Sequence, residues 1–270
     1  MLTTETVERW LREDVGHRDV TNHVPGRTSG RLVATESGVV AGLDAAAAVF
    51  DYLDCDPTST AASGDEVEAG ETVFDVSGRA RDVLRGERTA ANLVGHAAGV
   101  ATRTQRAVRA ARTASESVRV AATRKTTPGL RGVEKRAVAA GGGDTHRLTL
   151  SGLVMVKDNH IAEMGLEAAV EFFRDRKSFA TNLEVEVESP AAAVRAAEAG
   201  ADVVLLDNLP PTEVREAVDK VPDGVATEAS GGITLDSLPA YAETGVDVVS
   251  MGSLTHSAPS LDVSFRTDGR

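Results

Sequence analysis

The chain has 270 residues, of which 41% are hydrophobic and 26% charged, a composition typical of a globular protein. Its formal net charge of −12 argues against a nucleic-acid binder, which normally carries a basic face. No run of 18 apolar residues occurs and the opening residues 1–14 are polar and acidic, so we expect no membrane span, no signal peptide and a cytoplasmic location. The single Cys55 offers no internal disulfide and no basis for a structural zinc site.

The first hundred residues predict a mixed α+β domain. In chain order we expect a helix over residues 3–13, a strand over 31–40, an alanine-rich helix over 43–53, two short paired strands within 65–74, and a long helix over about 87–111. No internal repeat or disordered linker separates this part from the remainder, so the long helix leads directly into the next domain.

From about residue 116 the sequence alternates between short β-rich runs and amphipathic stretches. The expected strands cover residues 117–122, 153–156, 183–187, 203–206, 225–228 and 246–250. The expected helices cover residues 134–140, 163–176, 190–199, 211–221 and 235–243. Such alternation predicts right-handed βαβ units and a parallel sheet.

Six units are too few for a complete eight-unit barrel, so we expect an α/β fold with an open or incomplete α/β barrel and an N-terminal α+β sandwich domain. We place the barrel at residues 102–259. The N-terminal domain then comprises residues 1–101 together with the C-terminal tail, residues 260–270. Functional residues should gather at the carboxyl ends of the barrel strands.

Glycines follow the last two expected strands, in Ser230-Gly231-Gly232 and in Ser250-Met251-Gly252-Ser253. Glycine lets backbone N–H groups approach an anion closely, and the last two strand-to-helix loops of a barrel commonly bind phosphate. Tight turns without a ligand are the alternative explanation, weakened because both loops occupy the expected consecutive positions.

Two expected strands end in carboxylates. Strand alternation places Glu184, Glu186 and Glu188 on one face, and Asp207 ends the run 203–207. Carboxylates at adjacent strand ends suit Mg²⁺ or ribose hydroxyls, since hard cations prefer oxygen ligands. A buried layer of ion pairs inside the barrel is the alternative.

Basic residues lie near the ends of two other expected strands and just before one of them. Arg124 and Lys125 follow the strand 117–122, and Lys157 directly follows the strand 153–156. His146 and Arg147 lie between the glycines 141–143 and the strand 153–156. Any one of these residues alone is more simply explained as a solvated surface charge. Together at one barrel mouth they predict an anion site, in which arginine forks pair with carboxylates and lysine supplies a point charge.

These motifs resemble quinolinate phosphoribosyltransferases. The similarity rests most clearly on Arg124-Lys125-Thr126-Thr127-Pro128 and on Lys157-Asp158-Asn159-His160. Further matching segments run in order along nearly the whole chain, at residues 13–16, 38–42, 87–93, 141–147, 184–187, 205–208, 229–233 and 252–257. The chain departs from the family pattern at Thr149 and Gly152, and at residues 17–19, which puts local loop geometry in question but removes no charge.

The resemblance implies an enzyme that joins quinolinate to phosphoribosyl pyrophosphate, releasing CO₂ and pyrophosphate on the way to NAD. It implies Mg²⁺ as cofactor, held by Glu186 and Asp207, and Lys157, Glu186 and Asp207 as catalytic residues. It further implies a homodimer, or a higher oligomer, in which Arg88 reaches the active site of the neighbouring subunit.

The resemblance also divides the substrate-binding residues into two groups. Those expected to hold the carboxylates of quinolinate are Arg124, His146, Arg147 and Lys157. Those expected to serve phosphoribosyl pyrophosphate and its metal are Lys125, Glu186, Asp207, Ser230, Gly231, Gly232, Gly252 and His256.

Three other functions remain open from the sequence. A nicotinate phosphoribosyltransferase would use a related fold for a monocarboxylate, which needs fewer basic groups. A Schiff-base lyase would use Lys157 as nucleophile, although Asp158 and nearby arginines do not give the desolvated site this class requires. A non-catalytic sensor of phosphoribosyl pyrophosphate would bind without turnover.

The charge composition also indicates a halophilic protein. Lysines are few among the 29 basic residues, and 41 side chains are acidic. Carboxylate-rich surfaces stay hydrated at high salt, so we expect a stability that does not peak in low salt.

Overall fold

The computed structural model describes residues 2–268, which group into two compact units. The first unit comprises the residues up to Gln105, the segment Thr127–Gly142 and the residues from Ser257 onward. The second unit comprises Arg106–Thr126 and Gly143–His256. The sequence-based division assigned residues 127–142 to the barrel, whereas contacts such as the ion pair from Arg136 to Asp44 (2.9 Å) tie this segment to the first unit.

An antiparallel sheet forms the centre of the first unit. Its strands are ordered β12 (Val263–Thr267), β1 (Arg27–Ala34), β5 (Thr72–Arg79) and β3 (Asp56–Ser59). The helices of this unit are α1 (Thr4–Val15), α2 (Leu43–Tyr52), α4 (Arg131–Ala140) and the part of α3 (Ala80–Arg112) up to Gln105. Fully buried Leu32, Phe50 and Phe74 join the sheet to α2, with the two phenyl rings 5.8 Å apart.

Strand pairing in the first unit differs from the sequence prediction at two points. Residues 65–74 do not form a pair of strands with each other, because β4 (Glu66–Val67) pairs with β2 (Gly38–Val39) and β5 pairs with β1 and β3. The intervening turn is held by the end of β1, since Gly70 N–H donates to the Ala34 carbonyl (2.8 Å). The C-terminal tail, for which no strand was expected, supplies β12.

The second unit contains a parallel sheet of six strands, as the alternation of elements predicted. The strand order is β6 (Arg119–Ala121), β11 (Val248–Ser250), β10 (Ala226–Ser230), β9 (Val203–Asp207), β8 (Leu183–Val187) and β7 (Val154–Val156). Strands β7 to β11 are neighbours in chain order, and β6 joins the sheet beside β11. The first and last strands of this order are its two edges, so the strands form an open barrel.

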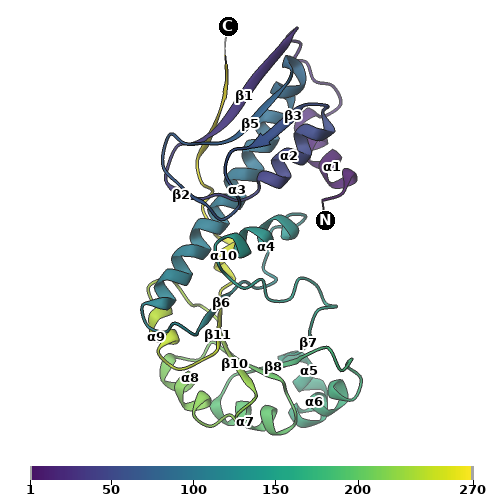
Figure 1. Ribbon diagram of the computed structural model, residues 1–270. Coiled ribbons are helices and arrows are strands. Elements are labelled where there is room, and N and C mark those ends of the chain that lie inside the picture. The colour runs from purple at the N-terminus through teal and green to yellow at the C-terminus, as the bar shows by residue number, and fades with distance from the viewer. Residues whose placement is uncertain (1, 269–270) are drawn as a thin grey trace. The chain divides into compact units, whose positions relative to one another are not determined.

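Helices cover the outer side of this curved sheet (Figure 1). They are α5 (Asp158–Met164), α6 (Leu166–Arg174), α7 (Pro190–Glu198), α8 (Pro211–Val218) and α9 (Leu238–Ala242), and the short α10 (Ser253–His256) follows β11. The single helix expected over residues 163–176 is two helices, because Gly165 between them adopts a φ of +80°. A helix also begins at Asp158, directly after β7, where only a strand end was expected.

Alternation along the strands separates two environments. In β8 the apolar Leu183, Val185 and Val187 are buried in the core, whereas Glu184 and Glu186 occupy the other face. A parallel strand covered by helices on one face therefore still carries polar groups on the face toward the inside of the barrel. Among residues 2–268, no helix combines the length and apolar character needed to cross a membrane.

Candidate active site

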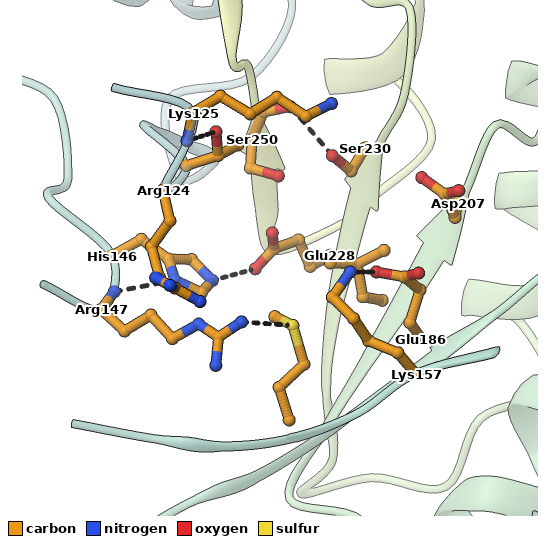
Figure 2. A pocket seen from close by; sticks show the side chains of 13 residues that line it. Arg124, Lys125, His146, Arg147, Lys157, Glu186, Asp207, Glu228, Ser230 and Ser250 are labelled. Carbon is orange, nitrogen blue, oxygen red and sulfur yellow. Dashed lines mark hydrogen bonds and ion pairs between the residues drawn. The ribbon is translucent and has the colours of Figure 1, made fainter. Parts of the chain in front are cut away.

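A cavity of about 490 Å³ opens inside the barrel of the second unit. Side chains from or just after all six strands line it, together with two from the segment between α4 and β7. The residues from or near the strands are Thr123, Arg124, Lys125, Met155, Lys157, Glu186, Leu205, Asp207, Glu228, Ser230 and Ser250, and those from the segment are His146 and Arg147. Figure 2 shows Arg124 and Arg147 on one side of this cavity, with Glu186 and Asp207 on the other. Eight of the residues that the sequence predicted for the site are thus brought together.

The segment carrying Arg124 and Lys125 is fixed by hydrogen bonds at the end of β6. The Lys125 backbone N–H donates to Thr123 Oγ1 (3.0 Å), and Thr255 Oγ1 donates to the Lys125 carbonyl (2.6 Å). Gly252 lies against the same lysine, since a Cβ added there would be only 2.8 Å from Lys125 Cδ. A side chain at Gly252 would therefore displace Lys125, which explains a glycine at this position.

Two guanidinium groups face the cavity, those of Arg124 and Arg147, and within residues 2–268 neither forms an ion pair with a carboxylate. Burial, and then the positive charge of Arg124, lower the pKa of Arg147. Arg147 Nη2 lies 2.9 Å from Met155 Sδ, and the buried Nε of Arg124 makes no hydrogen bond among the described residues. Bringing two like charges together is unfavourable unless an anion binds between them, so this wall of the cavity suits a ligand with more than one negative charge.

His146 connects this basic wall to the floor of the cavity. Its backbone is left-handed (φ +51°), and its Nδ1 accepts a hydrogen bond from the Arg147 backbone N–H (2.8 Å). Its Nε2 lies 3.1 Å from Glu228 Oε2 and 3.4 Å from Glu184 Oε2. The ring therefore contacts a buried glutamate on one side and the backbone of Arg147 on the other.

The two glutamates of the floor were not among the predicted site residues. Glu184 is 1% exposed and Glu228 3%, and burial, followed by the charge of Glu228, raises the pKa of Glu184 to about 8. The sequence did contain a signal, since Glu184 shares a strand face with Glu186, and Glu228 with Ser230. Thr123, Met155, Leu205 and Ser250 also line the cavity without having been predicted.

The acidic wall lies at the ends of β8 and β9. Lys157 Nζ forms an ion pair with Glu186 Oε2, and Asp207 Oδ2 accepts a hydrogen bond from the Asn208 side chain (2.7 Å). Because Lys157 already pairs with Glu186, Asp207 is the more available of the two carboxylates. Their oxygen atoms at one cavity edge fit the ligand preference of Mg²⁺.

The remaining predicted residues do not line the cavity. Gly231 and Gly232 follow Ser230 with φ values of +96° and +62°. A Cβ at Gly231 would lie 2.3 Å from Asn208 Oδ1, so the turn requires glycine there. His256 is exposed in α10, where its ring contacts Gly252.

Arg88 is an exposed residue of α3 and belongs to the first unit. Arg88 therefore does not line this cavity in its own chain, and its predicted role concerns the active site of a neighbouring subunit.

Comparison with known proteins identifies the family. Residues 18–98 match the quinolinate phosphoribosyl transferase N-terminal domain, and residues 100–266 match the C-terminal domain of the same family. A probable nicotinate-nucleotide pyrophosphorylase (carboxylating) from Methanothermobacter thermautotrophicus is 44% identical over 98% of this chain and 99% of its own length. The human nicotinate-nucleotide pyrophosphorylase (carboxylating) is also 44% identical, over 96% of this chain and 90% of its own.

Solved structures agree with this result. NadC from Streptococcus pyogenes superposes with a TM-score of 0.90 at 38% identity, covering 98% of this chain and 97% of that one. The family models, the sequence relatives and the solved structures all point to one family. This chain belongs to the quinolinate phosphoribosyl transferase family.

Proposed function

We propose that this protein transfers the phosphoribosyl group of phosphoribosyl pyrophosphate to quinolinate, giving nicotinate mononucleotide, CO₂ and pyrophosphate. The observation that carries this proposal is the paired guanidinium groups of Arg124 and Arg147, which face the cavity and form no ion pair with a carboxylate of the described residues. Quinolinate carries two adjacent carboxylates and matches two arginine forks better than a monocarboxylate does.

The chemistry divides into two steps. Pyrophosphate leaves C1 of the ribose, and the pyridine nitrogen of quinolinate forms the new bond to that carbon. The ring is then a pyridinium, so the adjacent carboxylate departs as CO₂ and its electron pair remains on a carbon next to the positive nitrogen, to be protonated afterwards. Such a reaction needs positioning and charge stabilisation more than covalent catalysis.

The cavity residues supply that positioning. Arg124 and Arg147 bind the two carboxylates and set the orientation of the ring, with His146 beside them. Lys125 and Ser230, at the ends of β6 and β10, offer an ammonium and a hydroxyl to the phosphates. Glu186 and Asp207 lie on the opposite side, where carboxylates can accept hydrogen bonds from the ribose hydroxyls.

Magnesium fits the same acidic wall. Glu186 and Asp207 are the residues that would hold it, directly or through water, because they offer hard oxygen donors at the cavity edge. When bound, Mg²⁺ neutralises negative charge on the leaving pyrophosphate.

The ion pair between Lys157 and Glu186 weighs against a Schiff-base lyase. A lysine nucleophile must be a neutral amine in a desolvated pocket, whereas this ammonium pairs with a carboxylate and is 43% exposed. We instead propose that Lys157 holds the ring or its departing carboxylate. A sensor without turnover has no observation in its favour, because the cavity combines the basic wall and the acidic wall that the reaction needs.

We further propose that the protein acts as a homodimer, or a higher oligomer, in which Arg88 completes the active site of the neighbouring subunit. This role follows from the resemblance that the sequence motifs show, and the exposure of Arg88 is compatible with it. The cytoplasmic location and the adaptation to high salt expected from the sequence stay predictions.

A turnover assay tests the proposal. Purified protein is incubated with phosphoribosyl pyrophosphate and Mg²⁺ in high salt, with quinolinate or with nicotinate, and nicotinate mononucleotide and CO₂ are followed. We expect product from quinolinate only, and loss of activity when EDTA removes the metal. Product from nicotinate only would retain the phosphoribosyl site but overturn the assignment of the basic wall, and binding without product would favour the sensor.

A further inference from the structure

Both ring nitrogens of His146 are already engaged by the protein. Nδ1 accepts from the Arg147 backbone N–H (2.8 Å), so it carries no proton. The proton of the neutral ring is then on Nε2, which donates to Glu228 Oε2 at 3.1 Å. In this arrangement neither ring nitrogen is left to donate to a carboxylate of the substrate.

Glu228 is held as a rigid acceptor. It is 3% exposed on β10, with Leu205 of β9 and Val248 of β11 paired on its two sides. A buried carboxylate between two paired strands cannot move far, so it fixes the ring that donates to it.

The conformation of His146 is held by hydrogen bonds to its backbone and to its ring. The His146 backbone lies in the left-handed region (φ +51°), a conformation that is strained for a residue with a side chain. Asp144 Oδ1 holds the backbone by accepting from His146 N–H (2.7 Å), while Glu228 holds the ring. The ring in turn fixes the peptide group from which the Arg147 side chain extends.

We propose that Glu228 is a positioning residue for quinolinate binding, acting through His146 to hold Arg147 at the basic wall. His146 is then a bridge between Glu228 and Arg147. This inference rests on the proposed function, because it assigns how one carboxylate-binding arginine of that site is held in place.

A metal ion is the competing explanation for the same cluster, since ligand atoms of His146, Glu184 and Glu228 lie within 4.8 Å of one another. A metal on Nε2 would require that nitrogen to lose its proton, while Nδ1 is already an acceptor. The ring would have to be a doubly deprotonated imidazolate, which is strongly unfavourable. The hydrogen-bonded arrangement therefore accounts for these contacts better than a metal does.

The test compares two substitutions of similar size. Glu228→Gln keeps an oxygen that accepts from His146 Nε2, whereas Glu228→Met removes the acceptor and also a buried charge, which favours folding. We expect Glu228→Met to weaken quinolinate binding on the order of tenfold, and Glu228→Gln to weaken it less than about threefold. Binding of phosphoribosyl pyrophosphate should change little in either, and Glu198→Gln, at an exposed residue of α7, is the matched control.

Two further measurements separate this idea from its alternatives. Nitrogen-15 spectra of labelled histidine, assigned with His146→Gln, should show Nε2 protonated in the wild type and in Glu228→Gln. In a double-mutant cycle, His146→Gln combined with Glu228→Met should cost no more than the larger single change.

Several results would overturn the inference. These are unchanged quinolinate affinity in Glu228→Met, fully additive losses in the cycle, an Nδ1-protonated ring in the wild type, or a metal that is stoichiometric in the wild type and lost from His146→Gln. If instead the wild type bound no quinolinate, the proposed function would fail, while the histidine spectra would still report whether Glu228 sets the state of His146.

Discussion

At the scale of single residues, the repulsion between the guanidinium groups of Arg124 and Arg147 affects how strongly the cavity binds an anion. Each guanidinium lies within the influence of the other, and the lowered pKa of Arg147 reflects its burial and that repulsion. A bound dicarboxylate offsets the repulsion between the two guanidinium groups. This relief strengthens its binding in addition to the hydrogen bonds that it accepts. Substrate binding should therefore depend on both arginines together.

Replacement of either arginine tests this directly. We expect Arg124→Ala and Arg147→Ala to raise the KM for quinolinate by roughly 100-fold or more, since a charge-assisted hydrogen bond contributes about 1.5–3 kcal/mol and each fork can make two. Steady-state kinetics provide the measurement, and circular dichroism with thermal melting verifies that the variants fold. Turnover at the wild-type rate and KM in either variant would refute the assignment.

Gly231 occupies a position whose surroundings tolerate only glycine. Gly231→Ala meets both a positive φ of +96° and the Asn208 side chain, 2.3 Å from the new Cβ. Gly142→Ala is the matched control, because it has a similar φ of +80° with nothing within 4 Å. Urea denaturation should show a loss of about 1 kcal/mol for the control from strain alone, and a clearly larger loss for Gly231→Ala. Equal losses would mean that Asn208 moves aside at no cost.

At the scale of elements, α4 is attached to α3 through one buried carboxylate. Glu134 is fully buried, and its oxygens accept hydrogen bonds from His96 Nε2 (2.9 Å) and from the Thr127 backbone N–H (3.1 Å). Burial raises the pKa of Glu134, but the hydrogen bonds from His96 and Thr127 outweigh it, and the pKa lies below its ordinary value. The carboxylate form is thus the one that the folded protein prefers.

A pH dependence of stability follows from this preference. A carboxyl group whose pKa is lowered on folding stabilises the protein above its unfolded pKa of about 4.3, and that stabilisation is lost as the pH falls through the folded pKa. We expect Glu134→Gln to reduce the free energy of unfolding by about 1–3 kcal/mol from pH 7 down to about pH 5, and by progressively less as the pH falls below about 4 through the folded pKa of Glu134. Urea titrations of the two proteins from pH 7 to about pH 3 measure the difference, and a difference that stayed constant below about pH 4 would contradict the account.

The elements also show what the sequence could and could not predict. The parallel strands of the barrel were predictable, because the apolar runs and helical stretches that alternate along residues 116–250 are local signals. The pairing partners of β4 and β5, and the existence of β12, depend on contacts between segments far apart in the chain. Local periodicity carries no information about such partners.

The same reasoning applies to the candidate site. Arg124, His146, Lys157 and Asp207 were predictable from their places near strand ends, and they do line one cavity. Glu228 was missed because its one signal in the sequence, the strand face that it shares with Ser230, does not reveal which residue it contacts. Its importance becomes visible only when His146, 82 residues away in the chain, is seen beside it.

At the scale of the whole molecule, the proposed sharing of active sites predicts complementation. Arg88→Ala and Arg124→Ala should each be nearly inactive as pure proteins. Dissociating and reassembling their mixture should form mixed dimers in which one site has both arginines intact, so activity should return to roughly a quarter of wild type if subunits pair randomly. Mixing without dissociation is the control. If no activity returned although mixed dimers formed, Arg88 would act within its own subunit or not at all.

The last strands of the chain complete the main sheet of each unit. The strand β12 pairs with β1, and Ser29 and Asp268 are therefore in contact although they are 239 positions apart in the chain. In the other sheet, β6 pairs with β11, so β6 has no neighbouring strand until β11 has formed. During synthesis on a ribosome, the edge of β1 that pairs with β12 therefore stays unpaired until almost the whole chain has emerged. An unpaired edge is a template for association with other chains. The nascent protein is consequently most exposed to aggregation late in translation. A premature stop near residue 260 would release a product that retains every residue of the cavity but leaves β1 as an unpaired edge of its sheet.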